Sequence, residues 1–210
     1  MFECDVKLSA DGEPFLLHDS NLDRTTSGQG VAGERRWDEL SKLDAGSWHS
    51  PPYAGEPLLR LEALARWLQA NQLMVNLEIK PSPGQDAVTG TAVAREAARW
   101  WSGQAVQPLL SSFSVEALRA AQNVAPDLPR ALLLETLRPT WLIEAASLAC
   151  VAVVVHHPHL NAENIAQAHS AGFKVLTYTV NDVERADELW AAELDGLITD
   201  SVDKLGPDRP

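Results

Sequence analysis

Residues 2–8 read Phe-Glu-Cys-Asp-Val-Lys-Leu, residues 9–14 read Ser-Ala-Asp-Gly-Glu-Pro, and residues 15–19 read Phe-Leu-Leu-His-Asp. Side chains alternate between the two faces of an extended strand, so Glu3 and Asp5 project from the same face. The turn-forming composition of residues 9–14 predicts a tight reversal. This stretch therefore predicts a strand, a turn and a short antiparallel strand.

The two carboxylates suggest a chemical role for this hairpin. At a separation of about 4 Å they would repel by roughly 4 kcal/mol in a surrounding of intermediate dielectric constant. A divalent cation would turn that repulsion into attraction, and the hairpin would bring His18 back towards Glu3 and Asp5. The alternative is a solvated edge strand followed by a surface histidine.

Beyond the hairpin, residues 20–58 are rich in Gly, Trp, Ser and Pro, and only residues 37–43 have helical spacing. Such a segment is too long for an ordinary connection and predicts an inserted functional lobe. Strand and helix patterns then alternate with short loops. The expected strands are 73–80, 109–113, 130–134, 151–156, 174–180 and 196–199, and the expected helices are 61–69, 86–101, 114–124, 139–148, 161–171 and 182–192.

This alternation predicts a parallel α/β fold. Polar residues follow almost every strand, whereas a doubly wound sheet would concentrate them at one switch point. We therefore expect one TIM (β/α)8-type barrel domain over residues 1–210, with the inserted lobe at about 20–58. Only seven barrel-type strands can be counted, because the strand at 15–17 must return antiparallel. The expectation is a barrel that lacks its first strand and helix.

Composition narrows the possible partners and the compartment. The formal net charge of -12 argues against nucleic acid and anionic membranes. Cys4 and Cys150 lie in apolar strand patterns, which favours reduced core thiols and a cytoplasmic protein. The sequence shows no signal-peptide pattern and no run of 18 apolar residues, so no membrane insertion is expected.

A third carboxylate falls in the next predicted strand. Asn76, Glu78 and Lys80 share one face of residues 73–80. An oxygen site formed by Glu3, Asp5 and Glu78 suits Mg²⁺ or Ca²⁺ rather than zinc. The alternative is a structural ion pair between Glu78 and Lys80.

Several motifs together resemble those of the glycerophosphodiester phosphodiesterases, and the resemblance runs over the whole chain in order. These motifs are Glu3-x-Asp5-Val6, Leu17-His18-Asp19-x-x-Leu22-x-Arg24-Thr25-Thr26, Asp44-Ala45-Gly46-Ser47-Trp48, Gly55-Glu56-Pro57, Asn76-Leu77-Glu78-Ile79-Lys80, Leu110-Ser111-Ser112-Phe113, Tyr178-Thr179-Val180-Asn181 and Thr199-Asp200.

The resemblance implies a TIM barrel and cation-dependent hydrolysis of small glycerophosphodiesters to glycerol 3-phosphate and an alcohol. It implies that Glu3, Asp5 and Glu78 hold the metal ion and that His18 is one of two acid/base histidines. It also implies that Lys80 contacts the phosphate and that Phe113 and Tyr178 line the substrate cleft. This sequence contains neither the His-Arg-Gly nor the Pro-Glu-Asn-Thr motif with which family members begin. We therefore expect an N-terminally truncated chain with impaired activity.

Three other interpretations stay open. The chain is a non-catalytic remnant that binds metal or phosphate, another phosphodiesterase of the same superfamily, or, as we prefer, the product of an incomplete gene model. A cleft or surface role, rather than metal ligation, is expected for His156, His157 and His159. Neighbouring residues of a strand face opposite ways, and Pro158 interrupts the strand before His159. The sequence leaves the oligomeric state open.

Overall fold

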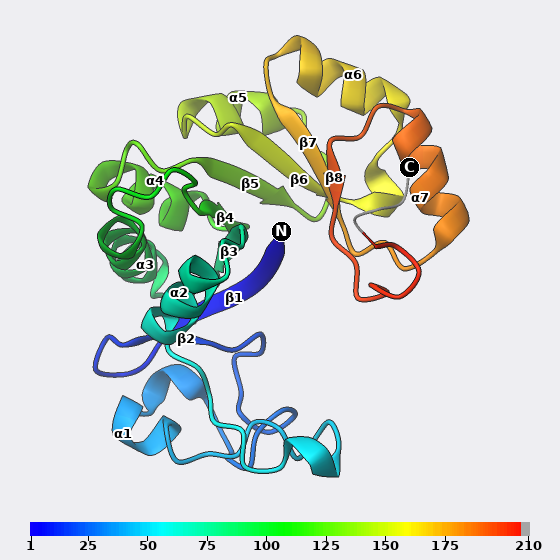
Figure 1. Cartoon of the computed structure of the whole chain (residues 1–210). Coiled ribbons are helices and arrows are strands. Elements are labelled where there is room, and N and C mark those ends of the chain that lie inside the picture. The colour runs from blue at the N-terminus through cyan, green and yellow to red at the C-terminus, as the bar shows by residue number, and fades with distance from the viewer. Residues whose placement is uncertain (207–210) are drawn as a thin grey trace. The chain divides into compact units, whose positions relative to one another are not determined.

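A computed structural model describes residues 1–206, and the chain divides into two compact units, Met1–Leu128 and the part from Pro129 onward (Figure 1). Each unit contains strands that alternate with helices, which confirms the predicted α/β class. The single domain predicted over residues 1–210 stays a prediction. No helix among the described residues is both long and apolar enough to cross a bilayer.

The first unit is built on a four-stranded sheet in the order β2-β1-β3-β4. β1 and β2 pair antiparallel, as the turn composition predicts, whereas β1, β3 and β4 pair in parallel. The strands are β1 (Phe2–Leu8), β2 (Pro14–Leu16), β3 (Val75–Ile79) and β4 (Leu109–Ser112). The helices are α1 (Trp37–Leu40), α2 (Leu61–Ala70), α3 (Asp86–Trp100) and α4 (Val115–Val124), with 3₁₀ turns at Ala32–Glu34 and Pro51–Tyr53.

Helices α2, α3 and α4 cover one face of the parallel strands. Val6, Leu77 and Leu110 belong to the buried cluster that also contains Leu68 of α2 and Ala94 of α3. Because strand side chains alternate, this packing leaves the residues between those apolar positions on the opposite face. That opposite face of β1 and β3 carries the predicted acidic residues.

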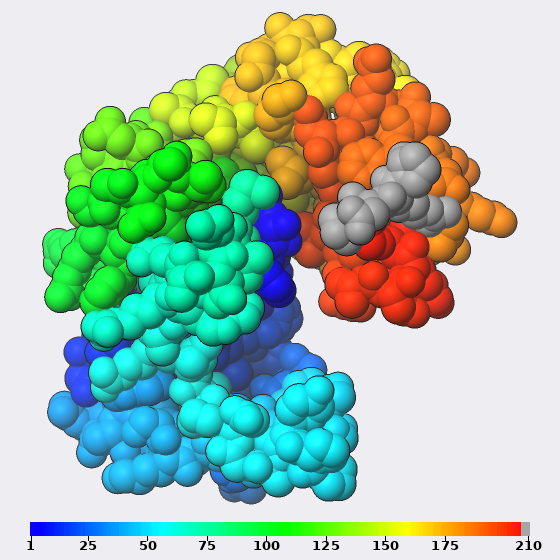
Figure 2. Space-filling view, in the orientation of Figure 1, coloured from blue at the N-terminus to red at the C-terminus, as the bar shows by residue number. Residues whose placement is uncertain are grey.

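The inserted lobe has a small hydrophobic core of its own. The surface of the lobe is the light blue and cyan part of the space-filling view (Figure 2). Its apolar contacts join the hairpin to the lobe, although the lobe sequence has no long apolar repeat. The buried residues of this core are Phe15, Leu17, Leu22, Ala32, Leu40 and Leu58.

The second unit contains four strands that pair in parallel in the order β5-β6-β7-β8. Its strands are β5 (Arg130–Leu134), β6 (Ala152–His156), β7 (Lys174–Tyr178) and β8 (Gly196–Leu197). Its helices are α5 (Trp141–Ser147), α6 (Ala162–Ser170) and α7 (Val183–Ala191), with a 3₁₀ turn at His157–His159.

Most elements are one to three residues shorter than the sequence predicts, and two of them show a cause. The helix expected over residues 37–43 ends at Leu40, because Lys42 and Leu43 donate to carbonyls three residues earlier and so form 3₁₀-type turns. The last strand ends at Leu197 rather than at residue 199. At Thr199 and Asp200, side-chain hydrogen bonds replace strand pairing. The side-chain oxygen of Asn181 accepts from the Thr199 hydroxyl and the Asp200 amide.

Candidate functional site

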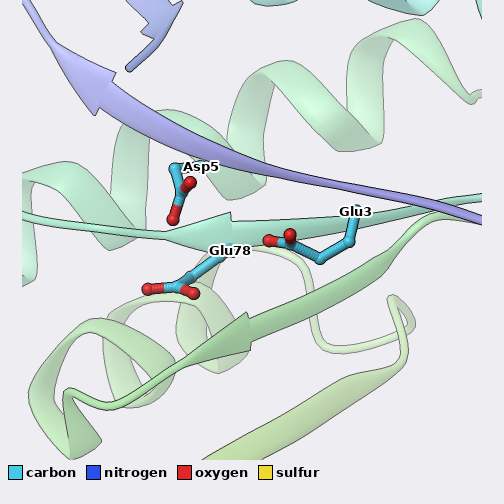
Figure 3. A group of neighbouring side chains, drawn as sticks. All are labelled: Glu3, Asp5 and Glu78. Atoms are coloured by element: carbon cyan, nitrogen blue, oxygen red, sulfur yellow. The ribbon is translucent and has the colours of Figure 1, made fainter. Parts of the chain in front are cut away.

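The three predicted carboxylates come together on the face of the sheet opposite the helices. Parallel pairing aligns Asp5 of β1 with Glu78 of β3, and Glu3 with Asn76. One oxygen from each of Glu3, Asp5 and Glu78 lies within 4.8 Å of the other two, and the three side chains converge (Figure 3). Oxygens that bind one Mg²⁺ or Ca²⁺ at about 2.0–2.6 Å lie at most about 4–5 Å apart, so the spacing fits one hard cation.

The environment of Glu78 supports this fit. Its Oε1 atom is buried and accepts no hydrogen bond within the described structure. Burial, assisted by the neighbouring charge of Asp5 and opposed by Lys80, raises the pKa of Glu78 to about 7. The nearest cationic group, Lys80 Nζ, lies 3.5 Å away, so this buried oxygen is poorly satisfied, and a bound cation would satisfy it.

Lys80 contacts the acids directly. Its Nζ atom donates to Asp5 Oδ1 over 2.8 Å and lies 3.5 Å from Glu78 Oε1. The sequence left a structural ion pair and a phosphate-binding role open for this lysine, and the structure shows the ion pair. The ammonium nevertheless lies beside the carboxylates that would hold a cation, where an anionic ligand would also sit.

Sequence reasoning overlooked a second lysine in this region. Lys7 is almost completely buried, and its Nζ atom donates to the Lys80 carbonyl over 3.2 Å. Burial lowers the pKa of Lys7 and the Lys80 charge lowers it further, whereas Asp5 and Glu78 oppose the shift. The sequence does indicate the position of Lys7, because it falls two residues after Asp5 and therefore on the same strand face.

Two buried polar groups lie on the same face; the sequence placed Asn76 there, but gave no role to Asn76 or to Ser111. Ser111 of β4 aligns with Glu78, and Asn76 aligns with Glu3. The Oγ atom of Ser111 and the Oδ1 atom of Asn76 are buried without a hydrogen-bond partner in the part of the chain that the structure describes. Both alignments follow from strand register, which the sequence alone does not fix.

His18 follows directly from the hairpin. The Leu17 amide donates to the Asp5 carbonyl over 3.2 Å, so the chain enters His18 beside β1. His18 Nδ1 lies 2.7 Å from Asp19 Oδ1. A protonated His18 also acts on Glu78, since its charge is among the causes that lower the pKa of that carboxyl, although burial dominates and raises it.

The two predicted aromatic residues lie in different units. Phe113 directly follows β4 in the first unit and is 43% exposed. Tyr178 ends β7 in the second unit, where its hydroxyl donates to the Leu134 carbonyl and its ring stacks on His156 at 5.3 Å. The structure therefore brings Phe113, but not Tyr178, into the unit that carries the acids.

The histidines of the second unit do not form a comparable cluster. The rings of His157 and His159 lie 5.5 and 5.9 Å from the ring of His156. Among residues 1–206, only Glu3, Asp5 and Glu78 bring three potential metal-binding atoms of separate residues within 4.8 Å.

Comparisons with known proteins agree on one family. The model of the glycerophosphoryl diester phosphodiesterase family matches residues 1–204. A glycerophosphodiester phosphodiesterase of Caldanaerobacter subterraneus is 29% identical, over 97% of this chain and 83% of its own length. An Oleispira antarctica phosphodiesterase, solved with its product sn-glycerol-3-phosphate, is 31% identical with a TM-score of 0.88, over 94% of this chain and 80% of its own. The Agrobacterium tumefaciens glycerophosphodiester phosphodiesterase is 26% identical with a TM-score of 0.77, over 94% of this chain and 82% of its own length.

Proposed function

The chain belongs to the glycerophosphoryl diester phosphodiesterase family, and from that premise we propose that it hydrolyses glycerophosphodiesters in a cation-dependent reaction centred on Glu3, Asp5 and Glu78. The products are sn-glycerol 3-phosphate and an alcohol. The observation that carries the proposal is the convergence of the three carboxylates within 4.8 Å. The product bound to the Oleispira antarctica relative supports the substrate class. The full TIM barrel and the cytoplasmic location stay predictions.

In this proposal the three carboxylates hold Mg²⁺ or Ca²⁺, which when bound neutralises phosphate oxygens and stabilises the charge of the transition state. Lys80 binds the phosphate by leaving its ion pair with Asp5, which joins atoms 2.8 Å apart. Phe113 and Tyr178 line the substrate cleft. The buried Lys7 supplies a fixed positive charge behind the site.

His18 acts as the general acid. The attacking oxygen, from water or from the 2-hydroxyl of the substrate's own glycerol, forms a bond to phosphorus as the bond to the leaving alcohol breaks, and the proton that this oxygen loses passes to solvent water. Attack by the 2-hydroxyl gives a cyclic phosphodiester, which a water molecule then opens to glycerol 3-phosphate. The leaving oxygen takes the proton from His18. A positioned acid contributes typically 10²–10⁴-fold to a rate. The other histidine of the first unit, His49, lies in the lobe and packs against the rings of Trp48 and Tyr53, so we propose His18 as the acid that this unit supplies.

The test is release of sn-glycerol 3-phosphate from glycerophosphocholine by chelator-treated protein, measured with and without added Mg²⁺ or Ca²⁺. Release that requires the cation and is lost in Glu78→Gln supports the proposal. Release that continues at the same rate in the Glu78→Gln variant refutes the assignment of the site. Cation binding without any release from a panel of phosphodiesters favours the non-catalytic remnant instead.

A further inference from the structure

The geometry points to Asp19 and Arg24 as positioning residues that hold the His18 ring in one tautomer, with the proton on Nδ1 and with Nε2 available for proton transfer. This inference rests on the proposed function, because it concerns the group that donates the proton to the leaving alcohol. It gives the inserted lobe a defined task, which is to orient the acid/base histidine beside the acidic cluster.

Three side chains form a continuous chain of contacts. His18 Nδ1 lies 2.7 Å from Asp19 Oδ1. Arg24 grips the same carboxylate with two nitrogens, since Nε donates to Oδ2 over 2.6 Å and Nη2 donates to Oδ1 over 2.9 Å. A bidentate arginine fixes both the position and the plane of a carboxylate. The plane of Asp19 in turn fixes the direction from which Nδ1 is approached.

The charge state of Asp19 determines which nitrogen of His18 carries the proton. Hydrogen bonds from Arg24 and from His18 hold the pKa of Asp19 well below its usual range. An ionised carboxylate can only accept hydrogen bonds, so Nδ1 must be the donor. The neutral ring then has its lone pair on Nε2, and the protonated ring has its transferable proton there.

Both ends of this chain of contacts are held by the fold. Leu17 is buried in the lobe core, and its amide donates to the Asp5 carbonyl. Leu22 is buried in the same core, and its carbonyl accepts from the amide and the hydroxyl of Thr26, which closes the turn that carries Arg24. An isolated exposed ion pair contributes little because both side chains lose freedom. Here the backbone on each side is already fixed, so less freedom is lost.

The arrangement matches the proton balance of the proposed reaction. When the leaving oxygen takes the proton from Nε2, the ring that remains carries its proton on Nδ1. That is the tautomer that Asp19 stabilises. Asp19 also stabilises the positive ring before transfer, because its negative charge faces the Nδ1–H group at every stage. In this inference Asp19 and Arg24 act through His18, because their observed contacts lead to its Nδ1 atom.

The test is to read the tautomer directly by long-range ¹H–¹⁵N correlation NMR of ¹⁵N-histidine-labelled protein at about pH 9, where ordinary imidazoles are neutral. A His18→Gln variant assigns the signal. We expect the Nδ1–H form in the unaltered protein and the Nε2–H form, which unconstrained side chains favour, in Asp19→Ala. Arg24→Met should give a mixture. The control is Arg66→Met, which removes an exposed arginine whose Nη2 lies 2.7 Å from Glu62 Oε1, and it should leave the His18 signal unchanged.

Kinetics of glycerophosphocholine hydrolysis supply the second measurement. Loss of the carboxylate that orients a catalytic histidine can lower kcat by up to about 10⁴-fold, and we expect a loss in kcat of at least about 10-fold with KM unchanged for Asp19→Ala, and a smaller loss for Arg24→Lys. An Nε2–H tautomer in the unaltered protein overturns the inference without any variant. A changed tautomer with unchanged kcat overturns it as well. If no substrate is hydrolysed, the proposed function fails and this inference about catalysis fails with it, whereas the tautomer measurement still reports whether Asp19 and Arg24 orient the ring.

Discussion

The ammonium of Lys80 lies 2.8 Å from Asp5 Oδ1, on a carboxylate that also belongs to the group able to hold a cation. Both side chains are largely buried, so this contact is screened less by water than a surface pair. Lys80 therefore compensates the acids when no cation is bound and competes with a cation that approaches.

Replacing Lys80 by Met should separate these two effects. Without divalent cation the variant should lose about 1–2 kcal/mol of unfolding free energy, because the carboxylates of Asp5 and Glu78 lose a partner. Its affinity for Mg²⁺ or Ca²⁺ should rise, because the competitor is gone. Chemical denaturation and calorimetric titration measure the two quantities.

The matched control for this variant is Lys174→Met. Lys174 Nζ pairs with Asp195 Oδ1 over 2.7 Å, but the lysine is largely exposed. Its replacement should change stability by less than about 0.5 kcal/mol and leave cation affinity unaltered. A Lys80→Met variant with the affinity and stability of the unaltered protein would show that the pair has neither role.

The pH dependence of stability should report the buried carboxyl of Glu78. Burial, assisted by the Asp5 charge, raises the pKa of Glu78 from its ordinary value of 4.5 to about 7. The folded protein therefore binds this proton more tightly than the unfolded chain does. The resulting stabilisation is fully present below about pH 4.5 and is lost as the pH rises through about 7.

Thermal unfolding of cation-depleted protein at about pH 5.5 and about pH 8 measures this contribution. The midpoint should fall more between these two conditions in the unaltered protein than in Glu78→Gln, which has no group to titrate there. Groups that do not interact with Glu78 titrate alike in both proteins, so the difference between the two reports Glu78 together with its neighbours Asp5 and Lys80. Parallel profiles for the two proteins would rule out the raised pKa.

Helices α3 and α4 touch at Gly90, and this contact should make a normally harmless substitution costly. A Cβ atom at Gly90 would meet the Ala117 carbonyl oxygen at 2.2 Å and the carbonyl carbon at 2.8 Å. Gly→Ala inside an exposed helix usually stabilises by up to about 1 kcal/mol. Here the backbone must move, so we expect a loss of about 1–3 kcal/mol by denaturant titration. Val88→Ala, at an exposed position of the same helix, should stay within about 0.5 kcal/mol.

Phe113 is the exposed aromatic residue that follows β4. If it lines the substrate cleft, Phe113→Ala should raise KM for glycerophosphocholine with little change in kcat, because the ring contributes equally to substrate and transition-state binding. Stability should change by less than about 0.5 kcal/mol. Val124→Ala, at another exposed apolar position of this unit, should leave KM unaltered. If the Phe113→Ala variant has the KM of the unaltered protein, Phe113 does not line the substrate cleft.

The elements could be predicted from local patterns. Alternation in residues 2–8 and 73–80 places Glu3, Asp5 and Glu78 on matching faces, and the turn at residues 9–14 brings the chain back to His18. The alternation of side chains along residues 2–8 also places Lys7 on the same face as Glu3 and Asp5. This alternation does not determine the register between neighbouring strands. The alignment of Asn76 with Glu3 and of Ser111 with Glu78 is therefore known only from the structure.

Side-chain geometry was equally out of reach of the sequence. Nothing in the spacing of Asp5 and Lys80 shows that their side chains meet across two strands. The hydrogen bonds from Arg24 to Asp19 depend on a turn that the buried Leu22 stabilises. Leu22 belongs to the lobe core, and the lobe sequence shows no helical or strand periodicity. Loop conformations of this kind depend on tertiary packing rather than on local propensity.

The most direct test of the central claim is calorimetric titration of Mg²⁺ or Ca²⁺ into chelator-treated protein and into its Asp5→Asn and Glu78→Gln variants. The control is Glu62→Gln, which alters a carboxylate of the same unit outside the cluster. The account predicts one cation per chain for the unaltered protein and the control, and no measurable binding for the two variants. Equal binding in all four proteins, or no binding in the unaltered one, would contradict the claim that these carboxylates form a metal site.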